Sequence, residues 1–239
     1  MAEDIGRLAA VDARALADAG FDAAILENFG DTPFLPRVGA ITVAAMTLAA
    51  VRVRDACPLL PLGVNVLRND AEAALAVAVA AGAVFIRVNV HIGARVTDQG
   101  LIQGEAGATL RARHALGASH VAVWADVDVK HSAPLGARAV ADEAADAALR
   151  GMADAILVTG EGTGRPVDTG KLAEVRRAVS VPVYVGSGAT LESLTLLGRT
   201  SDGVIVGSAL RRDGKAGGPI DPARAEAFAH AFREAFSKT

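Results

Sequence analysis

Short β-branched segments alternate with longer alanine-rich segments along all of this 239-residue chain, and few folds accommodate such a pattern. Periodicity and turn residues predict seven strands, at 22–27, 61–66, 84–90, 120–127, 154–159, 182–186 and 202–207. They predict eight helices, at about 4–19, 39–56, 70–81, 106–116, 136–150, 169–179, 190–197 and 221–236. Because a crossover helix covers the sheet that the next strand extends, the pattern predicts an α/β domain with a parallel sheet.

The first residues of the chain complicate the choice of a closed barrel. A (β/α)8 barrel begins with a strand, whereas "MAEDIGRLAAVDARALADAG" reads as a helix closed by Gly20. We therefore predict a single TIM (β/α)8-type barrel domain over residues 1–239 that lacks its first β-strand. Strands 22–27 and 202–207 would then face each other with unpaired backbone groups. A start inside a longer gene product is favoured over a gap filled by a partner subunit or by direct contact between these strands.

Amino-acid composition limits the classes of partner that such a domain is expected to bind. The 24 Lys and Arg residues and 27 Asp and Glu residues leave no basic excess for nucleic acid or anionic lipid, so a small-molecule partner is expected. The one cysteine, Cys57, excludes an internal disulfide and is expected to be a buried structural thiol. The longest apolar stretches, Val38–Val51 and Ala73–Ile86, are shorter than the roughly 20 residues of a membrane span. We expect a cytoplasmic protein without membrane insertion, and alanine-rich helices that support a homo-oligomer.

Two neighbouring strands end in similar small turns, in "VPVYVGSGAT" and "DGVIVGSAL". In a barrel the loops after the strands share one face, and the last two commonly hold a phosphate through backbone N–H groups. We predict a phosphate site at Gly186, Ser187, Gly188, Gly207 and Ser208. The alternative is that these glycines only end the strands.

Polar residues close the earlier strands. Glu27 is a candidate base, metal ligand or sugar-hydroxyl acceptor, or it pairs with an arginine inside the barrel while Asn28 caps the turn. The repeated "VNV" places Asn65 and Asn89 at successive strand ends, where an amide is unfavourable unless it is used. The two-residue period puts Arg87, Asn89 and His91 on one face, with Glu27 or Asp126 as the expected partner of Arg87. All are candidate substrate ligands: Asn28, Asn65, Arg87, Asn89 and His91.

The segment "WADVDVKHS" concentrates chemistry at the end of one strand. Asp126 is a candidate catalytic carboxylate, and Lys130 can form a Schiff base, neutralise phosphate or donate a proton if burial lowers its pKa. His131 titrates near neutrality and can move a proton, unless the loop is simply solvated. Glu27, Asp126 and Asp128 offer oxygens to Mg²⁺, but no metal-ligand spacing supports a metal site, and no cofactor is identified.

Two long loops complete the candidate site. "HIGARVTDQGLIQGEAG" is long enough for a lid, a binding surface or a subunit contact, with Asp98 and Gln99 able to reach the site on closure. "TGEGTGRPVD" offers Thr159 and Thr163 and resembles a flexible flap, because no Gly-Lys-Ser/Thr follows.

Seven segments resemble the BtpA family: "ILENFGDTPF", "PLGVNVLRND", "FIRVNVHIGARVTDQGLIQG", "VKHSAPLG", "ILVTGEGTG", "VYVGSGAT" and "GVIVGSAL". The resemblance runs from about residue 10 to 236 and implies a ribulose-phosphate-binding-type barrel. The best-known members are linked to photosystem I biogenesis, and other relatives include sugar-operon proteins. Members typically begin with a further strand that carries a His and a Pro-rich loop, which this sequence lacks.

Two functions follow from these observations. The first is an enzyme that isomerises, cleaves or hydrolyses a phosphorylated sugar or nucleotide-like metabolite. The alternative, which the resemblance implies, is a non-catalytic biogenesis or stability factor for a membrane complex of the photosystem I type. Polar residues gathered at strand ends favour the enzyme.

Overall fold

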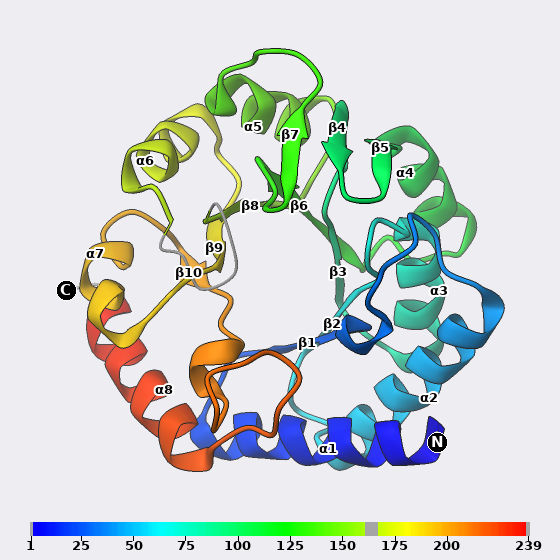
Figure 1. The fold of residues 1–239 in the computed structure, drawn as a ribbon, viewed down its shortest axis with the longest axis vertical. Helices are drawn as coiled ribbons and strands as arrows, with labels where there is room; N and C mark the ends of the chain where they lie inside the picture. The colour runs from blue at the N-terminus through cyan, green and yellow to red at the C-terminus, as the bar shows by residue number, and fades with distance from the viewer. Residues whose placement is uncertain (1, 161–166, 238–239) are drawn as a thin grey trace.

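The fold is a curled parallel sheet inside a ring of helices, as expected for a TIM-type barrel (Figure 1). The computed structural model describes residues 2–160 and 167–237. Neighbouring strands follow the order β1-β2-β3-β6-β8-β9-β10, all parallel. Their bounds are β1 (Ala24–Glu27), β2 (Leu62–Asn65), β3 (Phe85–Val88), β6 (Ala122–Val127), β8 (Ala155–Thr159), β9 (Val183–Ser187) and β10 (Gly203–Val204). The parallel order brings every strand's carboxyl end to one rim of the ring.

Eight α-helices of the described chain cover the outside of the sheet (Figure 1). They are α1 (Ala2–Ala19), α2 (Ala40–Ala56), α3 (Ala71–Ala81), α4 (Ala106–Ala115), α5 (Val140–Leu149), α6 (Thr169–Ala178), α7 (Leu194–Leu197) and α8 (Pro222–Phe236). Aspartates begin several of them, because a carboxylate satisfies the free N–H groups of the first turn. Asp70 caps α3 and Asp168 caps α6 in this way. None of the described helices is both long enough and apolar enough to span a membrane.

The sheet does not close by hydrogen bonds. In the described part of the chain, β1 pairs only with β2 and β10 only with β9, so these two strands form the sheet's edges. The predicted seven parallel strands are confirmed. The last is shorter than 202–207, although the amide of Ile205 still donates to Val185 and continues the ladder.

Three predicted elements differ from the structure. The expected helix 136–150 begins only at Val140, because residues 135–139 form an irregular turn between the strand at 132–134 and the helix. The expected helix 190–197 is divided into the 3₁₀ helix η2 (Leu191–Ser193) and α7. The segment expected as a long loop contains a β-hairpin.

That hairpin consists of β4 (Ala94–Thr97) and β5 (Gly100–Gln103), and β4 also pairs antiparallel with β7 (Ser132–Pro134). Since β4 follows β3 and β7 follows β6, this second sheet stands at the carboxyl rim of the barrel, between α4 and α5 in Figure 1. Its pairing joins segments more than 30 residues apart, which a local pattern does not reveal.

The barrel interior has an aromatic layer below a charged layer. Phe85 stacks on Trp124 with ring centroids 3.9 Å apart, and Trp124 stacks on Tyr184 at 4.7 Å. Two residues further along the same strands come Arg87, Asp126 and Gly186, which share the inward face by the two-residue period of a strand. The alternate residues of β3 and β6 pack outward in the hydrophobic core with the helices. The aromatic rings therefore support the charged layer from beneath.

Candidate functional site

A buried ion pair occupies the centre of the carboxyl rim. Arg87 donates from Nε to Oδ2 and from Nη2 to Oδ1 of Asp126, each at 2.9 Å, and the Asp126 side chain is 0% exposed. Burial opposes charge on Arg87, but the charge and hydrogen bonds of Asp126 outweigh it and raise the Arg87 pKa. The predicted pairing of Arg87 with a barrel carboxylate is confirmed, and its bidentate geometry is that of a strong charge-assisted contact.

Three polar residues extend this pair. Asn89 Nδ2 donates to Asp126 Oδ2 at 2.7 Å, and Asn65 Nδ2 donates to Glu27 Oε1 at 2.9 Å. The same Glu27 oxygen lies 3.5 Å from Arg87 Nη1. Glu27 is 29% exposed, so unlike Asp126 it remains within reach of a ligand. The structure thus brings together five of the predicted site residues.

The turn after β9 approaches this cluster closely. A β-bulge makes Thr159 pair with Ser187, so that Gly186 lies opposite the ion pair. A Cβ at Gly186 would stand 2.7 Å from Thr159 Cγ2 and 3.2 Å from Arg87 Nη2. Gly188 has a φ of +84°, which favours glycine, and the buried Ser187 Oγ has no hydrogen-bond partner among the described residues.

The turn after β10 lies beside the one after β9. Gly207 precedes the 3₁₀ helix η3 (Ser208–Leu210), and the pairing of β10 with β9 puts both turns on the same rim. The five residues predicted to hold phosphate therefore come from neighbouring segments.

Lys130 stands beside the ion pair on the loop after β6. Its backbone N–H donates to Thr159 Oγ1 at 3.2 Å, and its carbonyl accepts from Arg68 Nη2 at 2.7 Å. Burial, and then the charge of Arg87, lower the pKa of the Lys130 ammonium. Burial likewise lowers the pKa of Arg68, against the charge of Asp126. The cationic side chains of Lys130 and Arg68 therefore lie near the ion pair, where Asp126 is already bound to Arg87.

A second ion-pair network holds the same loop in place. Arg95, on β4, donates to Asp128 Oδ1 at 2.6 Å and contacts Glu143 of α5 at 3.2 Å. Lys171, on α6, donates to Asp128 Oδ2 at 2.8 Å. Burial alone would raise the Asp128 pKa, but Lys171 and Arg95 outweigh it and lower the pKa. Asp128 and His131 have left-handed φ angles of 49° and 57°, so the network fixes an unfavourable loop conformation beside Lys130.

Two predicted ligands have other roles. The Asn28 amide bonds both backbone groups of Leu67, donating to the carbonyl at 3.1 Å and accepting from the amide at 2.7 Å. It therefore joins the loops after β1 and β2, and substrate binding by Asn28 stays a prediction. His91 faces away from the cluster, because β3 ends at Val88 and the two-residue period ends with it. Its Nε2–H donates to the carbonyl of Gly151 at 2.8 Å.

The structure describes only some of the remaining predicted site residues. His131 is exposed, and burial followed by the charges of Lys130 and Arg68 lowers its pKa. Thr163 lies outside the described residues. The described chain holds no group of three or more His, Cys, Asp or Glu residues arranged for a metal ion. Asp126 faces Arg87 and Asp128 faces Arg95 and Lys171, so the three carboxylates considered for Mg²⁺ do not converge.

The sequence reading missed Arg68, Arg95 and Lys171. Arg68 follows Asn65 by three residues, and this closeness to a strand end was the available signal. Arg95 and Lys171 carried no such signal, since each reaches Asp128 from a distant element.

The position of His91 gives a testable pH dependence. The neutral ring donates its one N–H, at Nε2, to the carbonyl of Gly151. If Nδ1 were also protonated, no described residue would accept a hydrogen bond from it. Burial, and then Arg113, hold the His91 pKa below its ordinary value of about 6.5. Its contribution to stability is therefore complete above that value and is lost as the pH falls toward the folded-state pKa. We expect the loss to reach up to about 1.4 kcal/mol per pH unit.

Urea unfolding at pH 5, 6 and 7 measures this effect. The variant His91→Asn should show a shallower fall in the free energy of unfolding than the wild type. His114→Asn, at an exposed position of α4, should keep the wild-type slope. Equal slopes in wild type and His91→Asn would contradict the assignment.

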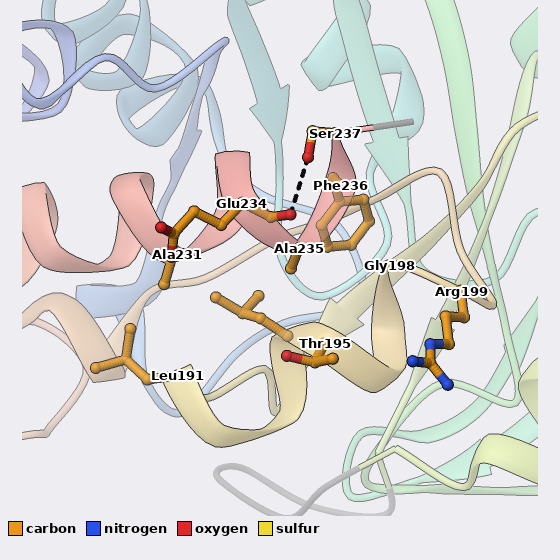
Figure 2. Close-up of a pocket in the computed structure, with 10 residues that line it drawn as sticks. Leu191, Thr195, Gly198, Arg199, Ala231, Glu234, Ala235, Phe236 and Ser237 are labelled. Carbon is orange, nitrogen blue, oxygen red and sulfur yellow. Dashed lines mark hydrogen bonds between the residues drawn. The ribbon is translucent and has the colours of Figure 1, made fainter. Parts of the chain in front are cut away.

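A groove on the surface lies away from this cluster. It opens between α7 and α8 on the outside of the ring, has a volume of about 640 Å³, and is lined by Leu191, Arg199 and Phe236 among others (Figure 2). Ser237 Oγ donates to the carbonyl of Glu234 at its edge. None of its lining residues belongs to the charged cluster, so the groove plays no part in the chemistry of the rim.

Comparison with known proteins identifies relatives of this chain. The BtpA family profile matches residues 2–234. Protein TK2179 of Thermococcus kodakarensis is 45% identical over 93% of this chain and 84% of its own length. The photosystem I biogenesis protein BtpA of Synechocystis is 45% identical over 93% of this chain and 78% of its own.

Solved structures share the fold at low identity. Thiamine phosphate pyrophosphorylase from Pyrococcus furiosus superposes with a TM-score of 0.64 at 15% identity, covering 95% of this chain and 91% of that one. The (S)-3-O-geranylgeranylglyceryl phosphate synthase of Thermoplasma acidophilum, in complex with sn-glycerol-1-phosphate, gives 0.61 at 16% identity, covering 95% and 88%. At these identities the likeness establishes the barrel fold.

Proposed function

The chain belongs to the BtpA family, and from that premise we propose that it is an enzyme acting on a phosphorylated sugar or nucleotide-like metabolite. The reaction is an isomerisation, a carbon–carbon cleavage or a glycosidic hydrolysis. The backbone N–H groups of the turns at 186–188 and 207–208 bind the phosphate, and the free Ser187 hydroxyl adds a hydrogen bond. Similar barrels named for phosphorylated compounds support this class of ligand.

The observation that carries the proposal is that Lys130 combines a lowered pKa with the lack of an ion pair in the described chain. The described residues offer its ammonium no ion pair, although Arg87, Asp126 and Glu27 lie close enough to affect its pKa. A lysine with a lowered pKa can exchange a proton or attack a carbonyl near neutral pH. A structural lysine would instead be paired with a carboxylate, as Lys171 is with Asp128.

Glu27 supplies the complementary group. It is the more exposed carboxylate of the cluster, and Asn65 and Arg87 hold one of its oxygens. Glu27 and Lys130 therefore form the acid–base pair, while Arg87 and Asp126 hold each other in place and fix the geometry. Asn89 and Asn65 orient the hydroxyl groups of the substrate.

A screen of phosphorylated metabolites, by thermal shift and then by turnover, tests the proposal. With the substrate so found, Lys130→Met is expected to lower turnover by about 10² to 10⁴-fold, the usual contribution of a proton-transferring group. The melting temperature should change by only a few degrees, since the ammonium makes no ion pair in the described chain. Lys215→Met, in an exposed loop, is the matched control and should retain full turnover. Unchanged turnover in Lys130→Met would refute the assignment.

A second candidate is a non-catalytic biogenesis factor for a membrane complex. The name of the Synechocystis relative favours it, and so does an apolar stripe on α1, where Ile5, Leu8 and Val11 are each at least 50% exposed. Such a scaffold would tolerate Lys130→Met and would lose partner binding when charged residues replace the three residues of the stripe. An enzyme should lose turnover in Lys130→Met and should keep it when the stripe is replaced.

A further inference from the structure

We infer that the metabolite carries a second anionic group besides its phosphate, and that Arg68 binds this group. The inference rests on the proposed function, because it concerns the other end of the same ligand. It narrows the substrate to sugar acids or related acids that carry a phosphate, or to bisphosphates.

The contacts of Arg68 leave most of its donors unused. The residue is 5% exposed, on the loop after β2, and its guanidinium makes one hydrogen bond to the described chain, from Nη2 to the carbonyl of Lys130. A guanidinium has five N–H donors in a planar fork that matches a carboxylate or a phosphate. Its remaining donors are therefore open to an anion in the rim.

None of the described carboxylates forms an ion pair with Arg68. Arg87 is matched by direct contacts with Asp126 and Glu27. Arg68 and Lys130 have no carboxylate within ion-pair distance in the described residues, and after burial and Arg87 the charge of Arg68 also lowers the pKa of Lys130. A buried cation without a partner is costly, and a ligand anion between the two removes that cost.

The anion position lies close to the proposed phosphate position. Arg68 contacts the carbonyl of Lys130, whose N–H contacts Thr159 Oγ1, and Thr159 pairs with Ser187 on the next strand. Neighbouring strands are about 4.8 Å apart, so a ligand of a few carbon atoms can extend from one position to the other.

An unpaired acceptor lies next to this path. Asn89 is 3% exposed, and its Oδ1 has no partner in the part of the chain that the structure describes, while its Nδ2 donates to Asp126. A buried amide oxygen of this kind calls for a donor, and a hydroxyl group of the ligand supplies one. The rim thus fits an anion, a hydroxylated centre and a phosphate in sequence.

Calorimetric titration of two matched ligand pairs tests the inference. Glycerol 3-phosphate is compared with 3-phosphoglycerate, which adds a carboxylate, and fructose 6-phosphate with fructose 1,6-bisphosphate, which adds a phosphate. In the wild type, the two-anion member of at least one pair should bind at least 10-fold more tightly. The pair that shows the gain identifies the second group.

The variant Arg68→Gln should reduce that preference to less than twofold and leave the affinity for the one-anion ligand nearly unchanged. Arg37→Gln removes an exposed arginine that pairs with Glu105 and should leave the preference intact. Circular dichroism and the fluorescence of Trp124 report whether the variants fold. If Arg68→Gln does not fold, Arg68→Lys decides: a threefold or greater fall in preference is expected, because lysine lacks the planar fork.

Three results overturn the inference. They are no gain in either wild-type pair, a preference that stays above twofold in Arg68→Gln or falls by less than threefold in Arg68→Lys, and an equal loss for one-anion and two-anion ligands in Arg68→Gln. Failure of the proposed function looks different, because then the wild type would bind neither inorganic phosphate nor any of the four ligands.

Discussion

Replacement of Asp126 by alanine is expected to lower the free energy of unfolding by about 3–5 kcal/mol, the range for breaking a buried ion pair. The substitution leaves the Arg87 guanidinium buried without its bidentate partner and removes the acceptor of Asn89. Glu27 cannot compensate, since its contact with Arg87 is long, at 3.5 Å, and it already accepts from Asn65. Urea unfolding at pH 7 measures the loss.

An exposed ion pair provides the matched control. Asp146 contacts Arg138 on the surface, where both side chains are more than one third exposed. Asp146→Ala should cost far less than Asp126→Ala, because water replaces the lost partner. The double variant Asp126→Leu/Arg87→Met should regain much of the loss, since it leaves no buried charge. Similar losses for Asp126→Ala and Asp146→Ala would contradict the model of a buried, solvent-excluded pair.

The pairing of Arg87 with Asp126 shows why part of the site could be predicted. Both residues lie within strands, where a two-residue period decides which side chains face inward. Charged residues on the inward face of a barrel must find partners there, so the sequence identified the contact. The glycine at 186 follows the same logic, because it ends a strand and faces the pair.

Residues outside the strands escaped prediction for a related reason. His91 lies three residues beyond the end of β3, and the period no longer holds there. Asn28 and Arg68 act through loop backbone, at Leu67 and Lys130, and no side-chain pattern encodes such contacts. The partners of Arg95 depend on the pairing of β4 with β7, a non-local event.

The second sheet thereby links the fold to the site. Arg95 belongs to β4, yet it neutralises Asp128 beside Lys130 and also contacts Glu143 of α5. A segment that looked like an open loop is thus a structured support for the loop that carries Lys130. This explains how a left-handed conformation at Asp128 is maintained.

The aromatic layer predicts the second large effect. A Cβ on Gly63 of β2 would lie 2.1 Å from Cε2 of Phe85, and that ring is pressed against Trp124 on its other side. Gly63→Ala is therefore expected to lower the free energy of unfolding by about 3 kcal/mol, at the upper end of the usual cost of overpacking. The change should also alter the emission of Trp124, the only tryptophan in the chain.

A double variant that relieves the clash shows whether Gly63→Ala destabilises the protein by crowding or only by the loss of glycine flexibility. In Gly63→Ala/Phe85→Leu the smaller side chain makes room for the new methyl group, so the double variant should be more stable than the sum of its single effects by at least about 1 kcal/mol. Gly136→Ala adds a methyl group where nothing lies within 4 Å and should change stability by less than about 0.5 kcal/mol. Strictly additive effects of Gly63→Ala and Phe85→Leu would mean that the ring moves freely, and that the aromatic layer does not hold Arg87 and Asp126 in position from beneath.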